Sequence, residues 1–354
     1  MLLLVIIMEN LFGYTFEKLE EKMVEMGQKK FRAQQLYSWL YQKRVKSIDE
    51  MSDISLAFRE ELKKHFTIDV PSIIAKQVSY DRTVKLLVEC ENKAAVETVL
   101  MRYDYGNAIC VSSQVGCNMG CSFCASGLLR KQRDLSAAEI VGQIMAMQYY
   151  LDENEPGERV THIVVMGTGE PFDNYDNVMN FVRICNHVRG LQIGARHITI
   201  STCGLVDKIR QYGKEGIQTN LAVSLHASND EIRNQIMKIS KVYSLPELMS
   251  AIKDYQRDSN RRVTFEYIML KGVNDGIENA VELRHLLEGI DGLINLIPYN
   301  EVSENGYKRS SNDAVRAFYD KLKKLGCNVT IRKEFGNDID AACGQLRAKK
   351  EGIL

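Results

Sequence analysis

The chain has 354 residues, of which 45% are hydrophobic and 26% are charged. This composition excludes a disordered chain, and a prior of roughly 150 residues per domain gives about two domains or one large barrel with an extension. The 46 basic and 46 acidic residues balance, so overall charge excludes a general polyanion-binding protein. Contact with nucleic acid would need a local basic patch.

The first eight residues, Met1 to Met8, are all apolar. This run is far shorter than the ~20 residues that a membrane-spanning helix requires, and it lacks the basic leader and cleavage site of a signal peptide. An upstream start codon would also explain it, with Met8 beginning the true protein. We therefore expect a cytoplasmic protein that has no membrane-spanning segment.

Residues 1–70 are predicted to form an N-terminal helical accessory domain, because apolar residues recur at helical spacing between positions 14 and 66. The segment Gln28–Lys46 contains six basic residues and no acidic residue, and Tyr37, Trp39 and Tyr41 are interleaved with them. A solvated helix face is one interpretation of this segment. An RNA-contacting surface is the alternative.

Residues 71–105 are predicted to form a small β extension. Hydrophobic and polar residues alternate in strand fashion at Val84–Val88 and Val96–Leu100. We expect these strands to form a small antiparallel insert between the helical domain and the rest of the chain.

Residues 106–350 show a regular alternation of short apolar runs and helical stretches. Alternation of this kind predicts an α/β fold with a parallel sheet, and the number of units favours a partial or full (β/α) barrel over a dinucleotide-binding sheet. The predicted strands are Ile109–Ser113, His162–Met166, His197–Ser201, Asn220–Ser224, Arg262–Met269, Ile294–Pro298 and Asn328–Arg332.

Unusual polar residues follow the predicted strands at the points where the strands end. In (β/α) barrels these ends converge on one mouth, where active sites are built. Packing alone does not explain so many polar and thiol groups on one rim. The segments concerned are Cys117–Cys124, Gly167–Glu170, Ser201–Thr202, Ser224–His226, Asn300 and Asp338–Cys343.

Three of the nine cysteines, Cys117, Cys121 and Cys124, fall within eight residues, which is not typical of a secreted disulfide framework. Structural zinc sites usually supply four ligands in two paired knuckles, and no second knuckle matches this one. Three thiolates can hold three irons of a cubane and leave the fourth iron open to chelate S-adenosylmethionine (SAM). We expect one [4Fe–4S] cluster here.

This spacing is the hallmark of the radical SAM superfamily, and further motifs resemble the RlmN/Cfr family of radical SAM RNA adenine methyltransferases. The resemblance extends in order from about residue 10 to about residue 350. It implies methylation of an adenine ring carbon in 23S rRNA and, for the RlmN branch, also in tRNA next to the anticodon. The motifs that carry the resemblance are Cys110–Cys117, Met166–Pro171, Ser224–His226 and Asp338–Leu346.

The resemblance also implies a detour through protein thiols, because an amidine carbon of adenine has no lone pair to attack the methyl group of SAM. Cys343 takes a methyl group from one SAM as a nucleophile. A second SAM yields a 5′-deoxyadenosyl radical that removes hydrogen from the methylated sulfur, and the carbon radical adds to adenine C2. Cys110 then takes the ring proton and releases the protein–RNA crosslink as a disulfide.

Other site residues are carried over from the same resemblance. Glu97 matches the family's proton acceptor, although strand alternation alone would place its side chain on a solvent face. The implied partners are 23S rRNA, tRNA and an external electron donor such as flavodoxin or ferredoxin, and we expect a monomer. The implied SAM contacts are Gly169, Glu170, Ser201, Ser224, Leu225, His226 and Asn300.

Two alternatives remain open at this point. A Cfr-like enzyme would methylate C8 of the same adenine, but Val115 and Pro171 resemble the C2 branch. A non-catalytic iron–sulfur RNA-binding protein would not need Cys343 and Cys110 together with a SAM pocket. The remaining cysteines are interpreted as inert thiols: Cys90, Cys185, Cys203 and Cys327.

Overall fold

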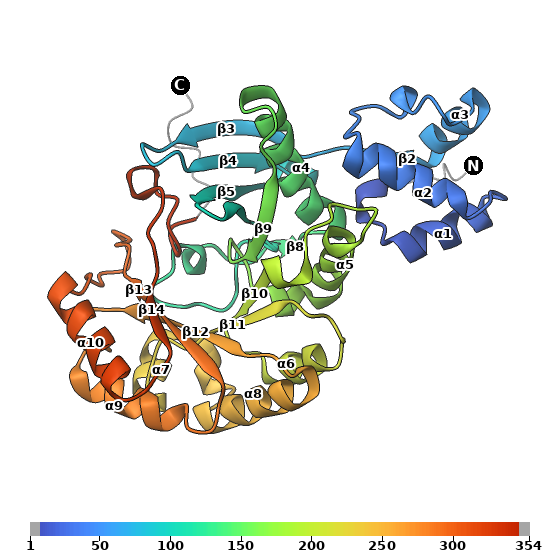
Figure 1. Ribbon diagram of the computed structural model, residues 1–354. Helices are drawn as coiled ribbons and strands as arrows, with labels where there is room; N and C mark the ends of the chain where they lie inside the picture. Colours follow the sequence, from blue (N-terminus) through green and yellow to red (C-terminus); the bar gives the residue numbers. More distant parts are fainter. Residues whose placement is uncertain (1–7, 347–354) are drawn as a thin grey trace, which may run out of the picture.

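The computed structural model describes residues 8–346 (Figure 1). The apolar residues Met1–Ile7, on which the interpretation of the start codon rests, lie outside the described residues, as does the end of the predicted barrel at 347–350. Among the described residues, no helix is both long enough and apolar enough to cross a bilayer.

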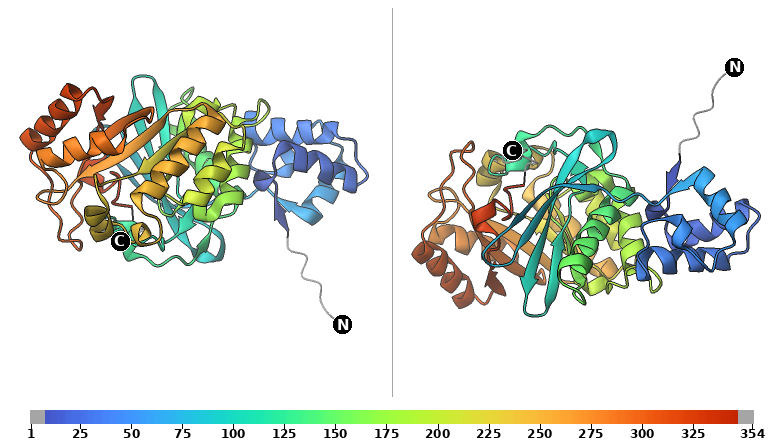
Figure 2. Two further views of the ribbon diagram at one scale, coloured as in Figure 1. Left: turned by 90° about the horizontal axis from the view of Figure 1, so that it is seen from below. Right: turned by 90° about the horizontal axis from the view of Figure 1, so that it is seen from above.

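A helical lobe precedes the sheet and lies to one side of it in all three views (Figures 1 and 2). Arg44 in this lobe reaches Asp152 of the first barrel helix with an Nε–Oδ2 distance of 2.7 Å, and Lys46 pairs with Glu153 at 2.9 Å. Part of the basic segment therefore docks the lobe instead of facing solvent freely. The elements are β1 Glu9–Asn10, η1 Leu11–Gly13, α1 Phe16–Glu25, α2 Phe31–Tyr37, η2 Ser38–Gln42, η3 Ile48–Glu50, α3 Leu56–His65 and β2 Phe66–Thr67.

The next strands extend the central sheet. β3 (Ser72–Val78), β4 (Val84–Glu89) and β5 (Ala95–Tyr103) pair antiparallel in sequence order, with η4 (Glu91–Lys93) between the last two. β5 also pairs antiparallel with β6 (Gly106–Cys110), the first strand of the parallel region. The expected antiparallel strands are therefore continuous with the main sheet of ten strands in the described residues.

The parallel region runs from β6 to β14, with helices between successive strands (Figure 1). The strands lie in sequence order, and β14 and β6 do not pair with one another in the described part of the chain. This is the predicted α/β fold in its open, partial-barrel form. The strands are β9 Val160–Val165, β10 Ile198–Thr202, β11 Asn220–Ser224, β12 Val263–Met269, β13 Gly292–Pro298 and β14 Val329–Ile331. The helices are α4 Ala137–Asn154, α5 Tyr175–Asn186, α6 Val206–Gly213, α7 Asp230–Ile236, α8 Leu245–Ser259, α9 Ile277–Leu286 and α10 Asn312–Lys324.

Local sequence explains why these elements begin where they do. α4 starts at a capping box, in which the Ser136 hydroxyl accepts from the Glu139 N–H and the Glu139 carboxylate accepts from the Ser136 N–H. Such a cap stabilises a helix by about 1 kcal/mol. The short elements of the loops are β7 Gln114–Val115, η5 Ala125–Leu128, β8 Arg133–Asp134, η6 Pro171–Asn174, η7 Ala195–His197, η8 Lys238–Lys241 and η9 Asn337–Ile339.

The first parallel strand ends earlier than predicted. The apolar run Ile109–Ser113 was expected as strand, but β6 ends at Cys110. The Gln143 side chain of α4 explains the difference, because its amide oxygen accepts from the Ser112 N–H at 2.8 Å and its amide nitrogen donates to the Ser112 carbonyl at 2.9 Å. At Ser112, the Gln143 side chain therefore makes the backbone hydrogen bonds that a neighbouring strand would otherwise make.

Candidate active site

The segment Gly116–Gly127, here called the cluster loop, carries the three closely spaced cysteines. Gly116 has φ +77°, and a Cβ atom there would lie 2.2 Å from the Arg130 carbonyl oxygen. A Cβ atom at Gly127 would lie 2.7 Å from the Cys121 carbonyl oxygen. Only glycine fits these close backbone approaches, so the loop curls tightly and turns its thiols toward one side.

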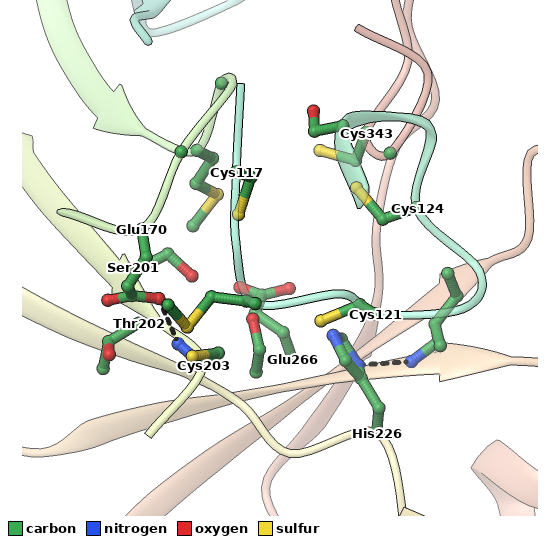
Figure 3. A pocket seen from close by; sticks show the side chains of 18 of the residues that line it. Cys117, Cys121, Cys124, Glu170, Ser201, Thr202, Cys203, His226, Glu266 and Cys343 are labelled. Carbon is green, nitrogen blue, oxygen red and sulfur yellow. Dashed lines mark hydrogen bonds between the residues drawn. The ribbon is translucent and has the colours of Figure 1, made fainter. Parts of the chain in front are cut away.

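The three thiols surround one end of a cavity of about 150 Å³, here called the main cavity (Figure 3). Burial raises the pKa of all three thiols, that of Cys117 to about 12. Backbone N–H groups act in the opposite direction, from Met119 on Cys117 and from Ser126 and Gly127 on Cys124.

As thiolates, these buried groups would require a cation to compensate their charge, and N–H donors to the sulfur atoms are typical of iron–sulfur ligation. In the described residues no three His, Cys, Asp or Glu side chains converge on a single metal-ion position. A cubane does not require such convergence, because each thiolate binds a different iron atom. The donor set therefore fits a [4Fe–4S] cluster.

The strand ends form the rest of the main cavity, as the sequence predicted. Leu225 is different, because its side chain is fully buried in the core and does not line the cavity, while its N–H donates to the Glu266 carbonyl at 3.1 Å. Asn300 lines an adjoining cavity of about 30 Å³, here called the side cavity. The predicted SAM contacts that line the main cavity are Gly169, Glu170, Ser201, Ser224 and His226.

Glu170 is buried, and its carboxylate is held by the backbone. Its oxygens accept from the Phe172 N–H at 3.0 Å and from the Cys203 N–H at 2.7 Å (Figure 3). Burial raises the pKa of this carboxyl group, and the N–H donors partly offset that effect. The preceding Gly169 has φ +112°, and a Cβ atom there would lie 2.7 Å from the Gln114 side chain. The carboxylate is thus fixed in place and can accept from an ammonium group.

His226 offers a neutral ring to the cavity. Its Nδ1 accepts from the Ile268 N–H at 3.1 Å, which leaves the proton on Nε2. Burial, assisted by the nearby positive charge of Arg233, lowers the pKa of His226 to about 3, so the imidazole stays uncharged. The other ring nitrogen faces the cavity and can donate a hydrogen bond there (Figure 3).

Cys343 and Cys110 are distant in sequence and meet at the side cavity. Cys343 lines both cavities and lies beside Cys124 (Figure 3), whereas Cys110, at the end of β6, lines the side cavity alone. Burial raises the pKa of Cys110 to about 12; negative charge on Cys343 acts in the same direction, and the Arg332 guanidinium acts against it. The two thiols therefore share the side cavity, and of the two Cys343 alone also lines the main cavity.

The loop that carries Cys343 is held from two sides. On one side the Asp338 carboxylate accepts from the Ser79 hydroxyl and the Tyr80 N–H, next to the β3–β4 turn. On the other side the Gly344 carbonyl accepts from the Ala125 N–H of the cluster loop at 2.8 Å. Asp338 thus anchors the loop to the β extension, which fixes Cys343 near the cluster ligands.

Glu97 lies in β5 and lines neither cavity. Its side chain is buried, which contradicts the solvent face suggested by strand alternation, because the C-terminal loop covers this part of the sheet. Lys85 of β4 lies 3.3 Å from the Glu97 carboxylate and also donates to the Asp340 carbonyl at 3.3 Å. Glu97 is therefore part of a buried ion pair beneath the Cys343 loop.

Sequence patterns did not indicate three further residues of the main cavity: Cys203, Glu266 and Arg332. Glu266, in β12, and Arg332, after β14, lie 3.6 Å apart, and both are shielded from solvent. Arg332 also approaches the Met166 sulfur at 3.6 Å, across the open side of the barrel. The one sequence signal for these residues was Glu266 itself, a charged residue within the apolar run Arg262–Met269. A carboxylate in such a strand indicates a side chain that faces the barrel interior.

An open (β/α) barrel with three thiols from one loop at its mouth defines a radical SAM enzyme. Residues 111–284 match the Radical SAM superfamily, and residues 9–68 match the ribosomal RNA large subunit methyltransferase N-terminal domain. A crystal structure of a radical SAM methyltransferase from Sphaerobacter thermophilus is 39% identical, with a TM-score of 0.91 over 96% of this chain and 100% of that chain.

The curated relatives identify the family. A protein of Enterococcus faecalis is 56% identical over 97% of both chains, and one of Spiroplasma citri is 52% identical over 98% of this chain and 99% of its own. Both are named probable dual-specificity RNA methyltransferase RlmN. The chain belongs to the RlmN family of radical SAM RNA methyltransferases. Membership confirms the predicted family and transferase class, and it implies a [4Fe–4S] cluster, SAM and RNA substrates.

Proposed function

We propose that this enzyme methylates C2 of adenine in 23S rRNA and in tRNA next to the anticodon, through a methylated Cys343 and a transient protein–RNA crosslink. The single observation that carries this proposal is the position of Cys343 at the boundary of the two cavities. One cavity holds the cluster ligands and the strand-end polar groups, and the other holds the second thiol. A residue that carries the methyl group from SAM to the RNA must face both cavities.

Cys117, Cys121 and Cys124 would hold the [4Fe–4S] cluster, and Gly169, Glu170 and His226 would contact SAM in the main cavity. When bound, these groups supply a methyl group and a 5′-deoxyadenosyl radical, with two SAM consumed per turnover. The Glu170 carboxylate, fixed by two backbone N–H groups, would accept from the SAM ammonium group. The neutral His226 ring would donate to SAM from Nε2 without adding positive charge to the cavity.

Cys343 accepts the methyl group at Sγ, where the loop contact to Ala125 keeps it beside the cluster loop. After the methylene carbon has bonded to adenine C2, the radical adduct returns one electron to the electron carrier, and Cys110 removes the ring proton and passes it to solvent. The Cys110 thiolate then bonds to the Cys343 sulfur, the bond between Cys343 and the methylene carbon breaks with its electron pair moving toward that carbon, and a proton from solvent completes the methyl group on the base. We assign proton removal to Cys110 because it lines the side cavity, whereas Glu97 does not.

The enzyme additionally requires a one-electron donor, for which a flavodoxin or ferredoxin is proposed, and a reductant for the disulfide. The basic part of the helical lobe that does not dock on α4 is proposed to contact RNA phosphates. We also propose that the protein acts as a cytoplasmic monomer. The domain limits 1–70, 71–105 and 106–350 are proposed on the same basis.

Nucleoside mass spectrometry tests the proposed function. Anaerobically reconstituted enzyme, SAM carrying a labelled methyl group and a reductant are incubated with a 23S rRNA fragment or with tRNA, and the RNA is digested. Labelled 2-methyladenosine from both RNAs is the expected result. Labelled 8-methyladenosine would instead establish the Cfr-like alternative, and absence of label with an intact cluster would contradict methylation of these RNAs.

A further inference from the structure

Arg233, on α7, is a fully buried arginine at the carboxyl ends of two barrel strands. Its Nη2 donates to the Cys203 carbonyl at 2.7 Å and to the Ser224 carbonyl at 3.4 Å, and its Nε donates to the Leu225 carbonyl at 3.2 Å. The guanidinium therefore ties the end of β10 to the end of β11. These two ends supply cavity-lining residues, including Ser224.

No carboxylate of the described residues lies within ion-pair distance of this arginine, and Asp230, on the same helix, acts on it only from farther away. None of the ion pairs in the described residues includes Arg233, and its Nη1 is buried without a hydrogen-bond partner. An isolated buried charge costs several kcal/mol unless an opposite charge is nearby. A nearby negative group is required to explain why an arginine is stable at this position.

The cluster loop lies directly against the helix that carries Arg233. The Ser122 N–H donates to the Ile236 carbonyl at the end of α7 at 2.9 Å, and the Ser122 hydroxyl donates to the same oxygen at 3.2 Å. Cys121 packs against a group of buried hydrophobic side chains that includes Cys203 and Ile236. Cys203 therefore links the guanidinium, which donates to its carbonyl, to the Cys121 side of the cluster loop.

Burial lowers the pKa of Arg233, and negative charge on Cys203, Cys121 or Asp230 would act in the opposite direction. Three thiolates around a [4Fe–4S] cluster give the centre a net negative charge, which increases by one when the cluster is reduced. A fixed cation beside it therefore stabilises the reduced form more than the oxidised form.

We propose that Arg233 is a positioning residue with two effects: its positive charge raises the reduction potential of the cluster, and its fork of donors sets the strand ends that contact SAM. This inference rests on the proposed cluster at Cys117, Cys121 and Cys124. Lysine would keep the charge but lose the fork, because an ammonium group cannot reach three carbonyls with fixed geometry. The two effects are therefore separable by substitution.

Redox titration of the reconstituted full chain tests the charge effect, with the reduced cluster measured by electron paramagnetic resonance. At a fixed potential, Arg233→Gln should lower the ratio of reduced to oxidised cluster about tenfold, which is about 59 mV for a one-electron couple. Arg261→Gln is the matched control, because Arg261 is a half-buried arginine bonded to Asn220 at the opposite end of β11. It should leave the ratio unchanged.

Arg233→Lys provides a second measurement. A buried lysine loses its proton far more readily than arginine, so the potential of this variant should fall as the pH rises, while the wild-type potential does not follow the same trend. Equilibrium dialysis should show weaker SAM binding by both Arg233 variants and unchanged binding by the Arg261 control.

A wild-type potential in Arg233→Gln would overturn the charge effect. If that variant does not retain the cluster, a pH-independent potential in Arg233→Lys would overturn it instead. Unchanged SAM affinity in both Arg233 variants would overturn the positioning effect. A wild-type protein that binds no iron would contradict the proposed function and would be recognised before any variant is compared.

Discussion

The thiols of the active site come from two regions that differ in how they are assembled. Cys117, Cys121 and Cys124 lie on one loop, and their arrangement follows from local backbone geometry at Gly116 and Gly127. Cys110 and Cys343 lie on a strand end and a C-terminal loop, and only the fold brings them to one cavity.

This difference affects how securely each region is held. The cluster loop is fixed by its own turns and by α7, so it forms a compact unit. The Cys343 loop depends on contacts with the β3–β4 turn on one side and with Ala125 on the other. A loop held at its two ends can carry a sulfur atom between two cavities, which the cluster ligands do not need to do.

The largest expected effect is on Cys110 and Cys343, whose substitutions should have opposite results. Cys110→Ala should accumulate enzyme covalently linked to RNA, because the adduct on Cys343 forms and only its release is blocked. Cys343→Ala should form no adduct, and the double variant should behave like Cys343→Ala. Denaturing gels followed by peptide mass spectrometry of nuclease-treated protein would show the attachment site.

Cys327→Ala is the control for this pair, because Cys327 is half-buried like Cys343 and lines neither cavity. It should release methylated RNA normally. RNA trapped on Cys110 in the Cys343→Ala protein would show that the two roles are reversed. Free methylated RNA from Cys110→Ala would show that another residue resolves the adduct.

Substitution of the three cysteines in the cluster loop should instead prevent binding of the iron–sulfur cluster. Anaerobically reconstituted protein should bind about four irons and four sulfides per chain, and Ala at Cys117, Cys121 or Cys124 should abolish that binding. Iron and sulfide analysis with visible absorption provides the measurement. Cys203→Ala is a demanding control, because Cys203 lines the same cavity but should not be a ligand. Stoichiometric zinc without visible absorption would contradict the cluster.

The buried pair beneath the Cys343 loop should have an intermediate effect. Glu97→Ala leaves Lys85 as an unpaired buried cation and should lower the free energy of unfolding by about 3 kcal/mol, as measured by urea denaturation. The double variant Lys85→Met/Glu97→Leu removes both charges and should recover much of that loss. If this double variant is stable and accumulates the protein–RNA adduct without releasing methylated RNA, Glu97 is the proton acceptor and our assignment to Cys110 is wrong.

The smallest expected effect concerns the basic segment, which is contiguous in sequence but divided in the structure. Lys29→Glu/Lys30→Glu/Arg32→Glu should weaken RNA binding and flatten its salt dependence, because fewer counterions are released. Arg44→Gln/Lys46→Gln, at the contact with α4, should leave the salt slope unchanged and lower stability by about 1 kcal/mol or less. Equal salt slopes for the triple variant and the wild type would favour the solvated face.

The sequence predicted the elements that depend on local pattern. Six of the seven parallel strands fall within two residues of their predicted bounds, because apolar runs between helices report burial directly. The convergence of Cys117, Cys121 and Cys124 on one cavity agrees with their spacing in the sequence. In contrast, Arg332 and Arg233 have no local pattern that marks them, since each acts through groups contributed by distant strands.

The orientation of single side chains has the same origin. Leu225 follows the end of β11 between two cavity-lining neighbours, and its side chain points into the core. Glu97 seemed exposed by alternation in β5, yet a loop more than two hundred residues later covers it. Which face of a strand is solvated depends on what packs against it, and that information is non-local.

Gln143 has a consequence for how freely this enzyme can vary in sequence. Its amide completes the hydrogen bonding of Ser112, between Cys110 and Cys117, by accepting and donating at once. Glutamate lacks the donor, leucine lacks both groups, and asparagine is one methylene shorter. Few substitutions of Gln143 should therefore be tolerated, although the residue lines neither cavity. In a mutational survey it would stand out as a position that is sensitive to substitution and remote from the active site.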